Sequence, residues 1–327
     1  MELILASAAG IEEKVIPYDV DIATGIENTF EIAIPKADWD GSYTVNKLIY
    51  LPGTEFGGII GGLRSQEDPE AVYVKGMTWR GLLRKKIISP ADGEDYYTIS
   101  GDLNECIAQL LADFYADDLI TAAEDPAGAE VYDFRFQRYT DLLSGMESMA
   151  AAVGHRIKIK FDQASGAVIV SALRIRNYSA TVEMSEDTEA KLTAEQISNG
   201  VNHLICLGQG ELRDRMVLHL YTDAQGTIVD RQQLFGRNEI AEVYDNTGAE
   251  TLEDLRSGGI ERLEEIKSRK IVEAISVTPS EELEIGDIVT AIDYITGIRA
   301  QKPIAGKILR ITGEIASIEY TLEGEEA

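Results

Sequence analysis

The C-terminal segment constrains the fold most. It contains an alternating apolar run at residues 283–290, a turn at Thr296-Gly297, and further apolar stretches at residues 304–309 and 314–322. Apolar residues that alternate with polar ones and are broken by Gly-containing turns predict β-strands that return on one another. These strands carry no catalytic set of residues. We therefore expect a β unit that serves assembly rather than chemistry.

Length and charge narrow the class of protein. A chain of 327 residues exceeds the usual size of one domain, so two or three domains are expected. No apolar run approaches the about 18 residues needed to span a bilayer. The 57 Asp and Glu outnumber the 30 Lys and Arg, and the net charge of −27 argues against binding a nucleic-acid backbone. The acidic excess serves either solubility or a conduit along which a polyanion slides without sticking.

The N-terminus and the cysteines indicate an ordinary intracellular chain. Residues 1–10 begin without basic residues, carry Glu2 and have too short an apolar run for a secretion signal, so a first β-strand is expected there. Cys106 and Cys206 lie far apart and form no C-x-x-C pair. Both are expected to be reduced, buried thiols in a cytosolic product.

Residues 1–98 have the pattern of a β domain. Apolar or alternating runs at 31–35, 43–51 and 71–75 are separated by Pro and Gly breaks. The glycine-rich segment 55–63 lacks the Lys-Ser/Thr ending of a phosphate-binding loop. It predicts a bulged strand or a close approach of two backbones instead.

A basic cluster follows this β region. Residues 74–88 predict a strand, a bend at Gly76 and a short helix. The helix ends in the densest group of cations in the chain: Arg84, Lys85 and Lys86. Two interpretations stay open. The cluster is either a solvated face beside a buried pair, Ile87-Ile88, or a contact with an acidic neighbouring subunit.

Two amphipathic helices come next. Asp102 and Glu105 have the spacing of a capping box at the start of a helix over residues 103–114. A second helix is predicted over residues 140–153, with Gly154 placed to end it. Cys106 falls in the apolar stripe of the first helix, which favours a core role over a nucleophile.

Two hairpins and a third helix complete the pattern. Residues 156–173 alternate around a turn at Gly166, and residues 215–229 repeat this turn chemistry at Gly226. A third helix is predicted over residues 251–270, where Gly258-Gly259 indicates a kink or a close contact. The helices and first hairpin predict a small α+β domain at residues 99–178.

The sequence offers no convincing chemistry. His155, His203 and His219 are expected to be isolated from one another, and none has a metal-site spacing. The chain has no G-x-S-x-G elbow, and adjacent carboxylates in polar loops do not make a glycosidase pair. We assign no catalytic, cofactor-binding or metal-binding residue, and we expect no cofactor and no enzyme activity.

The order of elements resembles the tail-hub proteins of tailed bacteriophages and prophages, which share the baseplate-hub fold, and most of all their siphophage and prophage branch. The likeness rests on the strand-Gly-helix stretch at residues 74–88, the helix-hairpin block at residues 142–173 and the closing pattern at residues 285–320. Residues 1–60 resemble the family least.

The resemblance implies a β-rich α+β fold with two β-barrel domains. The expected domains are an N-terminal barrel at 1–98, the α+β insertion at 99–178, and a second barrel at 179–327 with a helical insertion around 249–270. The implied function is a structural hub that joins the tail tube to the distal tail tip and forms a channel for DNA.

The implied assembly is a homotrimeric ring of six barrels that contacts tail-tube, distal-tail, tape-measure and tail-tip proteins. It would reside in the virion tail, and in the bacterial cytoplasm during assembly, without sequence-specific nucleic-acid binding or a membrane span. Arg84, Lys85 and Lys86 would then lie on an outer or intersubunit face. A tail-associated cell-wall hydrolase and a carbohydrate-binding attachment module are the alternatives.

Overall fold

The computed structural model describes residues 2–67, 70–188, 190–197, 199–249, 251–276, 283–313 and 315–322. Strands predominate over helices, which confirms the predicted β-rich α+β class. The chain forms two compact units. Unit 1 comprises Met1–Lys191, Ala274–Ala291 and Gln301–Leu322, and unit 2 is built around Leu192–Glu273 and Ile292–Ala300.

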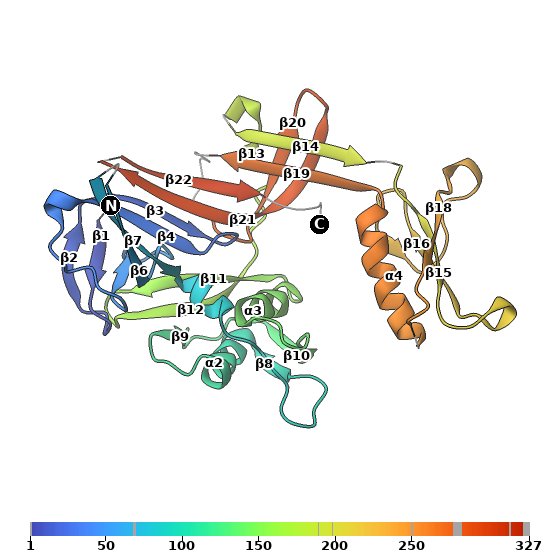
Figure 1. The fold of residues 1–327 in the computed structure, drawn as a ribbon, viewed down its shortest axis with the longest axis horizontal. Helices are drawn as coiled ribbons and strands as arrows, with labels where there is room; N and C mark the ends of the chain where they lie inside the picture. The colour runs from blue at the N-terminus through green and yellow to red at the C-terminus, as the bar shows by residue number, and fades with distance from the viewer. Residues whose placement is uncertain are drawn as a thin grey trace. The chain divides into compact units, whose positions relative to one another are not determined.

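The main sheet of unit 1 is antiparallel along the order β19-β22-β21-β3-β4-β7-β6-β5-β1-β2 (Figure 1). Its N-terminal strands are β1 Leu3–Ala6, β2 Glu12–Ile16, β3 Asp19–Thr24, β4 Thr29–Pro35, β5 Leu48–Tyr50, β6 Gly57–Glu67 and β7 Glu70–Thr78. The C-terminal strands are β19 Arg269–Ser276, β20 Ile288–Asp293, β21 Ile298–Thr312 and β22 Ile315–Leu322. Strand β20 pairs with β21 and with the short β13, Glu183–Met184.

The two ends of the chain meet in this sheet. Strand β21 pairs with β22 on one side and with β3 on the other, so that Leu309 lies opposite Ile22. Both side chains are fully buried, because the alternating pattern places every second residue on the core face. Within the described pairings β2 is bonded on one side alone. The two closed barrels therefore stay a prediction.

The glycine-rich strand β6 behaves as the sequence predicts. Its register with β7 shifts between Ile60 and Gly62, as in a bulge. A Cβ on Gly58 would lie 2.1 Å from the carbonyl oxygen of Met77, so the two backbones approach too closely for a side chain. The bend predicted at Gly76 is wrong. Gly76 lies inside β7, where the space of its missing side chain is filled by the ring of Phe30.

An α+β layer packs within the same unit. Its elements are α1 Trp79–Arg84, β8 Thr98–Asp102, α2 Leu103–Phe114, β9 Ile120–Ala122, β10 Glu130–Arg135, α3 Leu142–Ala151, β11 His155–Asp162 and β12 Ala167–Arg174. Strands β11, β12 and β9 form one sheet, and β8 pairs with β10. The predicted helices and hairpin are confirmed. Gly154 and Gly166 both have the positive φ that their turns require.

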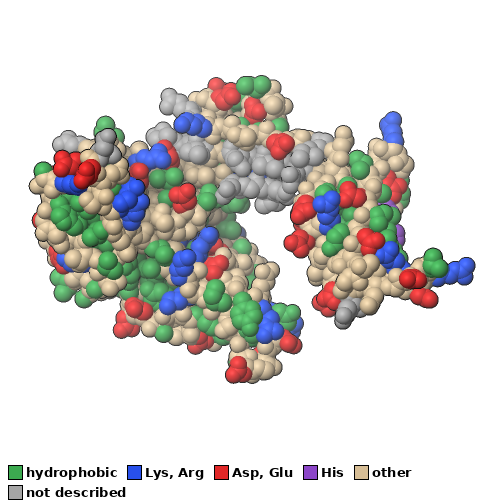
Figure 2. Space-filling view, viewed as in Figure 1, with side chains coloured by type: hydrophobic (Ala, Val, Ile, Leu, Met, Phe, Trp, Pro, Cys, Tyr) green, Lys and Arg blue, Asp and Glu red, His purple; other side chains and the backbone are tan. Residues whose placement is uncertain are grey.

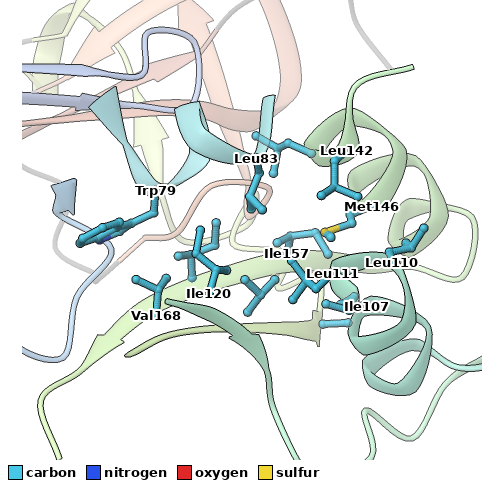
Figure 3. Close-up of a cluster of buried hydrophobic side chains, with 14 of the residues drawn as sticks. Trp79, Leu83, Ile107, Leu110, Leu111, Ile120, Leu142, Met146, Ile157 and Val168 are labelled. Atoms are coloured by element: carbon cyan, nitrogen blue, oxygen red, sulfur yellow. The ribbon is translucent and has the colours of Figure 1, made fainter. Parts of the chain in front are cut away.

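One apolar core joins this layer to the first sheet. Figure 3 shows side chains from α1, α2, α3 and β11 gathered in this core, with Trp79 of α1 at one edge of it. The ring of Phe161 stacks on Trp79 at 5.9 Å and on Tyr50 at 3.8 Å between centroids, so β5, α1 and β11 share one aromatic stack. Burying each such side chain contributes about 1.5–3 kcal/mol. Cys106 belongs to this core, as predicted.

Unit 2 is a two-layer structure. Its sheet has the order β17-β16-β15-β18, built from β15 His203–Leu207, β16 Val217–Thr222, β17 Ile228–Val229 and β18 Ala241–Asp245. Helix α4, Leu252–Ile266, begins at a capping box of Thr251 and Asp254 and packs on the sheet. Strand β14, Lys191–Ile197, also belongs to this unit from Leu192 on. Gly258-Gly259 does not interrupt α4. Gly259 instead contacts buried Cys206, which confirms a close contact there.

Candidate functional site

A buried ion-pair network lies at the centre of unit 1. Arg80, in the first turn of α1, has a side chain that is 2% exposed. Its Nε donates to Glu55 Oε2 at 3.0 Å and its Nη1 to Glu147 Oε1 at 2.9 Å. Its Nη2 donates to the carbonyl oxygen of Ile157 at 3.1 Å. The guanidinium thus joins the segment before β6 to α3 and β11.

Lys307 extends the network into the C-terminal strands. Its Nζ lies 2.7 Å from Glu55 Oε1 and 2.5 Å from Glu284 Oε2. Burial by itself would raise the pKa of Glu55, but the charges of Lys307 and Arg80 outweigh this effect and lower the pKa to about 2. Glu55 is therefore an ionised buried carboxylate at neutral pH, held between two cations.

Asp287, three residues after Glu284, provides a second buried carboxylate. The side chain of Asp287 is fully buried and accepts from Arg156 Nε at 2.8 Å and from Arg176 Nη2 at 2.7 Å. It also accepts from the backbone amide of Glu284 at 3.0 Å. The hydrogen bond to Asp287 raises the pKa of Arg176. Asp287 thereby fixes the turn before β20 against β11 and the chain that follows β12.

The contacts of this network suit holding segments of the chain together. Each buried carboxylate lies between two cations, so the arrangement suits positioning rather than proton transfer. Removing one member of such a set leaves an uncompensated buried charge, which typically costs about 3–5 kcal/mol. Its members come from the three stretches 1–98, 99–178 and 179–327, so it joins segments that the sequence suggested as separate.

The prediction of three isolated histidines is wrong for two of them. His203 Nδ1 lies 2.6 Å from Glu239 Oε1, and His203 Nε2 lies 2.8 Å from His219 Nδ1. Strands β15 and β16 pair His203 with Tyr221 and Ile205 with His219, which places the two histidines diagonally on one sheet face. Alternation in both strands could have indicated this pairing. His155 Nδ1 contacts the carbonyl oxygen of Val153 at 2.8 Å, a local polar role.

The predicted basic cluster ends α1. Arg84 and Lys85 are exposed, and the Nζ of half-buried Lys86 lies 5.5 Å from the centroid of the Tyr115 ring. Within the described parts of the chain none of these three cations forms an ion pair. The buried pair predicted beside them is half wrong. Ile88 is buried, but the side chain of Ile87 is 47% exposed, and its backbone bridges to Asp141.

An acidic groove lies between α2 and β9. Its volume is about 480 Å³ and its floor is apolar. Its rim carries five exposed carboxylates, none of which forms an ion pair with another described residue: Glu105, Asp117, Asp118, Glu124 and Asp125. Acidic and basic side chains otherwise intermingle over each unit on the face drawn in Figure 2. The groove thus concentrates one sign of charge.

The described residues present neither a metal-binding cluster nor a membrane-spanning helix. No cluster of three or more His, Cys, Asp or Glu side chains there is arranged to hold a metal ion. No helix in the same residues combines the length and the apolar character that crossing a bilayer requires.

Comparison with known proteins finds likeness in structure. No protein-family model matches the chain, and no curated protein matches it. A tail protein from Neisseria meningitidis MC58 aligns over 99% of this chain and 97% of its own, with 15% identity and a TM-score of 0.51. The 43 kDa tail protein of prophage MuSo2 from Shewanella oneidensis aligns over 98% of both chains, with 12% identity and a TM-score of 0.55. The chain has the fold of these two tail proteins.

Proposed function

We propose that the chain is a non-enzymatic hub of a phage or prophage tail, which joins the tail tube to the distal tip and forms a channel for DNA. The observation that carries this proposal is the fold match to two tail proteins over nearly the full length of each chain. Both alignments cover the two units of the chain. The predicted boundaries near residues 98 and 178, and the two barrels, belong to this proposal.

The interior of the chain supports a rigid structural role. The buried network of Arg80, Glu55 and Lys307 binds the N-terminal sheet, the α+β layer and the C-terminal strands into one body. A subunit that holds two neighbouring proteins in a fixed relative position must itself be rigid, and buried ion pairs of this kind make it so. In the proposed homotrimeric ring, carboxylates along the channel would repel DNA at short range, within a Debye length of about 8 Å. The ring would form in the bacterial cytoplasm and stay in the virion tail.

Electron microscopy of the purified chain with the tail-tube protein from the same gene cluster tests this proposal. We expect rings of three chains with six similar densities around an axial opening, capping tubes at one end. Single particles without axial symmetry, at a concentration at which the tube protein polymerises, would contradict it. A cell-wall zymogram tests the hydrolase alternative, and a cleared band would replace the structural proposal by an enzymatic one.

A further inference from the structure

Unit 1 carries two exposed surfaces of opposite charge. The first is a basic ridge at the end of α1, formed by Arg84, Lys85 and Lys86 together with the exposed side chain of Ile87. The second is the acidic groove, whose rim holds five carboxylates. All eight charged groups lack an ion-pair partner among the described residues.

The two surfaces also match in apolar character. The floor of the groove is formed by Ala108, Leu111 and Ala112 from α2 and by Ile120 and Ala122 from β9. Ile87 projects from the ridge among three cations, whereas its neighbour Ile88 is buried in the core. Ile87 is therefore an exposed apolar side chain among cations, and the groove has an apolar floor with carboxylates on its rim. Contact would remove apolar surface from water and pair the charges together.

We propose that the basic ridge of one copy docks in the acidic groove of a second copy of this chain. The occupant is a second copy because the chain itself displays the complementary surface. Within one copy no described ion pair joins the two surfaces, and the Nζ of Lys86 lies over the Tyr115 ring instead. This inference rests on the proposal that the chain assembles with itself, and it names the residues through which it does so.

Charge exchange tests the contact. Sedimentation velocity over a concentration series measures self-association of the wild type, of Lys85→Glu/Lys86→Glu and of Asp117→Lys/Asp118→Lys. We expect each double variant to associate at least about tenfold more weakly than the wild type, because attraction at the rim becomes repulsion. A mixture of the two variants, and a chain that carries all four substitutions, should regain association. Raising the salt from about 0.05 M to about 0.5 M should weaken wild-type association.

A matched control separates this contact from a general effect of charge. Arg213→Glu/Arg237→Glu makes the same change at two exposed arginines of unit 2 that have no ion pair among the described residues, and it should leave association unchanged. Circular dichroism checks that each variant is folded. If the ridge and groove variants associate like the wild type, or if the fourfold variant stays as weak as either double variant, the docking is wrong.

The same variants separate this inference from the proposed function. Rings that form with the tail-tube protein in spite of both charge reversals would overturn the docking and leave the hub proposal intact. A wild-type chain that stays monomeric alone and with the tube protein would overturn both.

Discussion

The buried carboxylate of Glu55 offers the sharpest test of how unit 1 is held together. Glu55→Gln preserves the shape of the side chain and removes its charge. Arg80 and Lys307 then lose their shared carboxylate and keep Glu147 and Glu284, which lie closer to solvent. The pKa of Glu55 is lowered from 4.5 to about 2, which means that the folded protein stabilises the ionised carboxylate over the protonated one by about 3 kcal/mol. Loss of one partner from a buried ion pair costs about 3–5 kcal/mol. We therefore expect unfolding to become easier by about 3 kcal/mol.

Urea unfolding at neutral pH measures this change. Both tryptophans, Trp39 and Trp79, lie in unit 1, so their fluorescence reports that unit. Glu13→Gln is the control, because it removes one carboxylate from the more exposed pair with Lys47 and should change stability far less.

A double-mutant cycle identifies the source of the effect. Lys307→Met should also destabilise, but the pair Glu55→Gln/Lys307→Met should destabilise by less than the sum of the two, with a coupling of about 1–3 kcal/mol. Arg80 keeps Glu147 in every variant of this cycle. A loss below about 1 kcal/mol for Glu55→Gln, or additive effects of the two changes, would refute the view that this network locks unit 1.

The acid stability of unit 1, a close contact in unit 2 and the start of α2 can be tested in the same way. Because the folded pKa of Glu55 is depressed, its contribution is complete above about pH 4.5 and disappears as the pH falls toward about 2, so Glu55→Gln should flatten the acid side of the stability curve. Gly259→Ala should destabilise unit 2 despite the better helix propensity of alanine, because its Cβ would lie 2.5 Å from Cys206 Sγ. Gly258→Ala should be tolerated, because its Cβ would lie 2.9 Å from the Tyr244 hydroxyl and 3.5 Å from Asn246 Nδ2, both at the ends of flexible side chains. Thermal melts of the two variants measure the difference. Asp102→Ala should lower urea stability by about 1–3 kcal/mol, since this carboxylate accepts from the start of α2 and from two loop amides.

Local sequence signals predicted local structure well. The periodicity of residues 103–114 and 140–153 predicted α2 and α3, and glycines at turns predicted both hairpins. The capping box at Asp102 was half right. Its carboxylate caps α2 through the Asn104 amide, and its remaining capacity goes to the amides of Ala127 and Gly128. The sequence has no local signal for a partner that comes from a distant loop.

The candidate site could not be found in the same way. Arg80 is 25 residues from Glu55 and 67 from Glu147, and no spacing rule links either pair. The pattern around Arg80 predicts a short helix, and an arginine on such a helix is ordinarily exposed. Its burial follows from where the sheet places α1. The histidine pair was missed for a related reason, because contact across strands depends on register rather than on distance along the chain.

Register also explains why a charged pair at the centre of unit 1 is useful. Lys307 lies opposite Thr24 of β3 and Tyr320 of β22, so two ladders fix its position in β21. A slip of one residue would turn Lys307 to the other face of the sheet and leave Glu55 with Arg80 alone. An apolar pair would tolerate such a slip better, because one buried aliphatic side chain can replace another. The local sequence patterns do not fix the register between β3 and β21. The ion pair therefore raises the free energy of an incorrect register between the two ends of the chain.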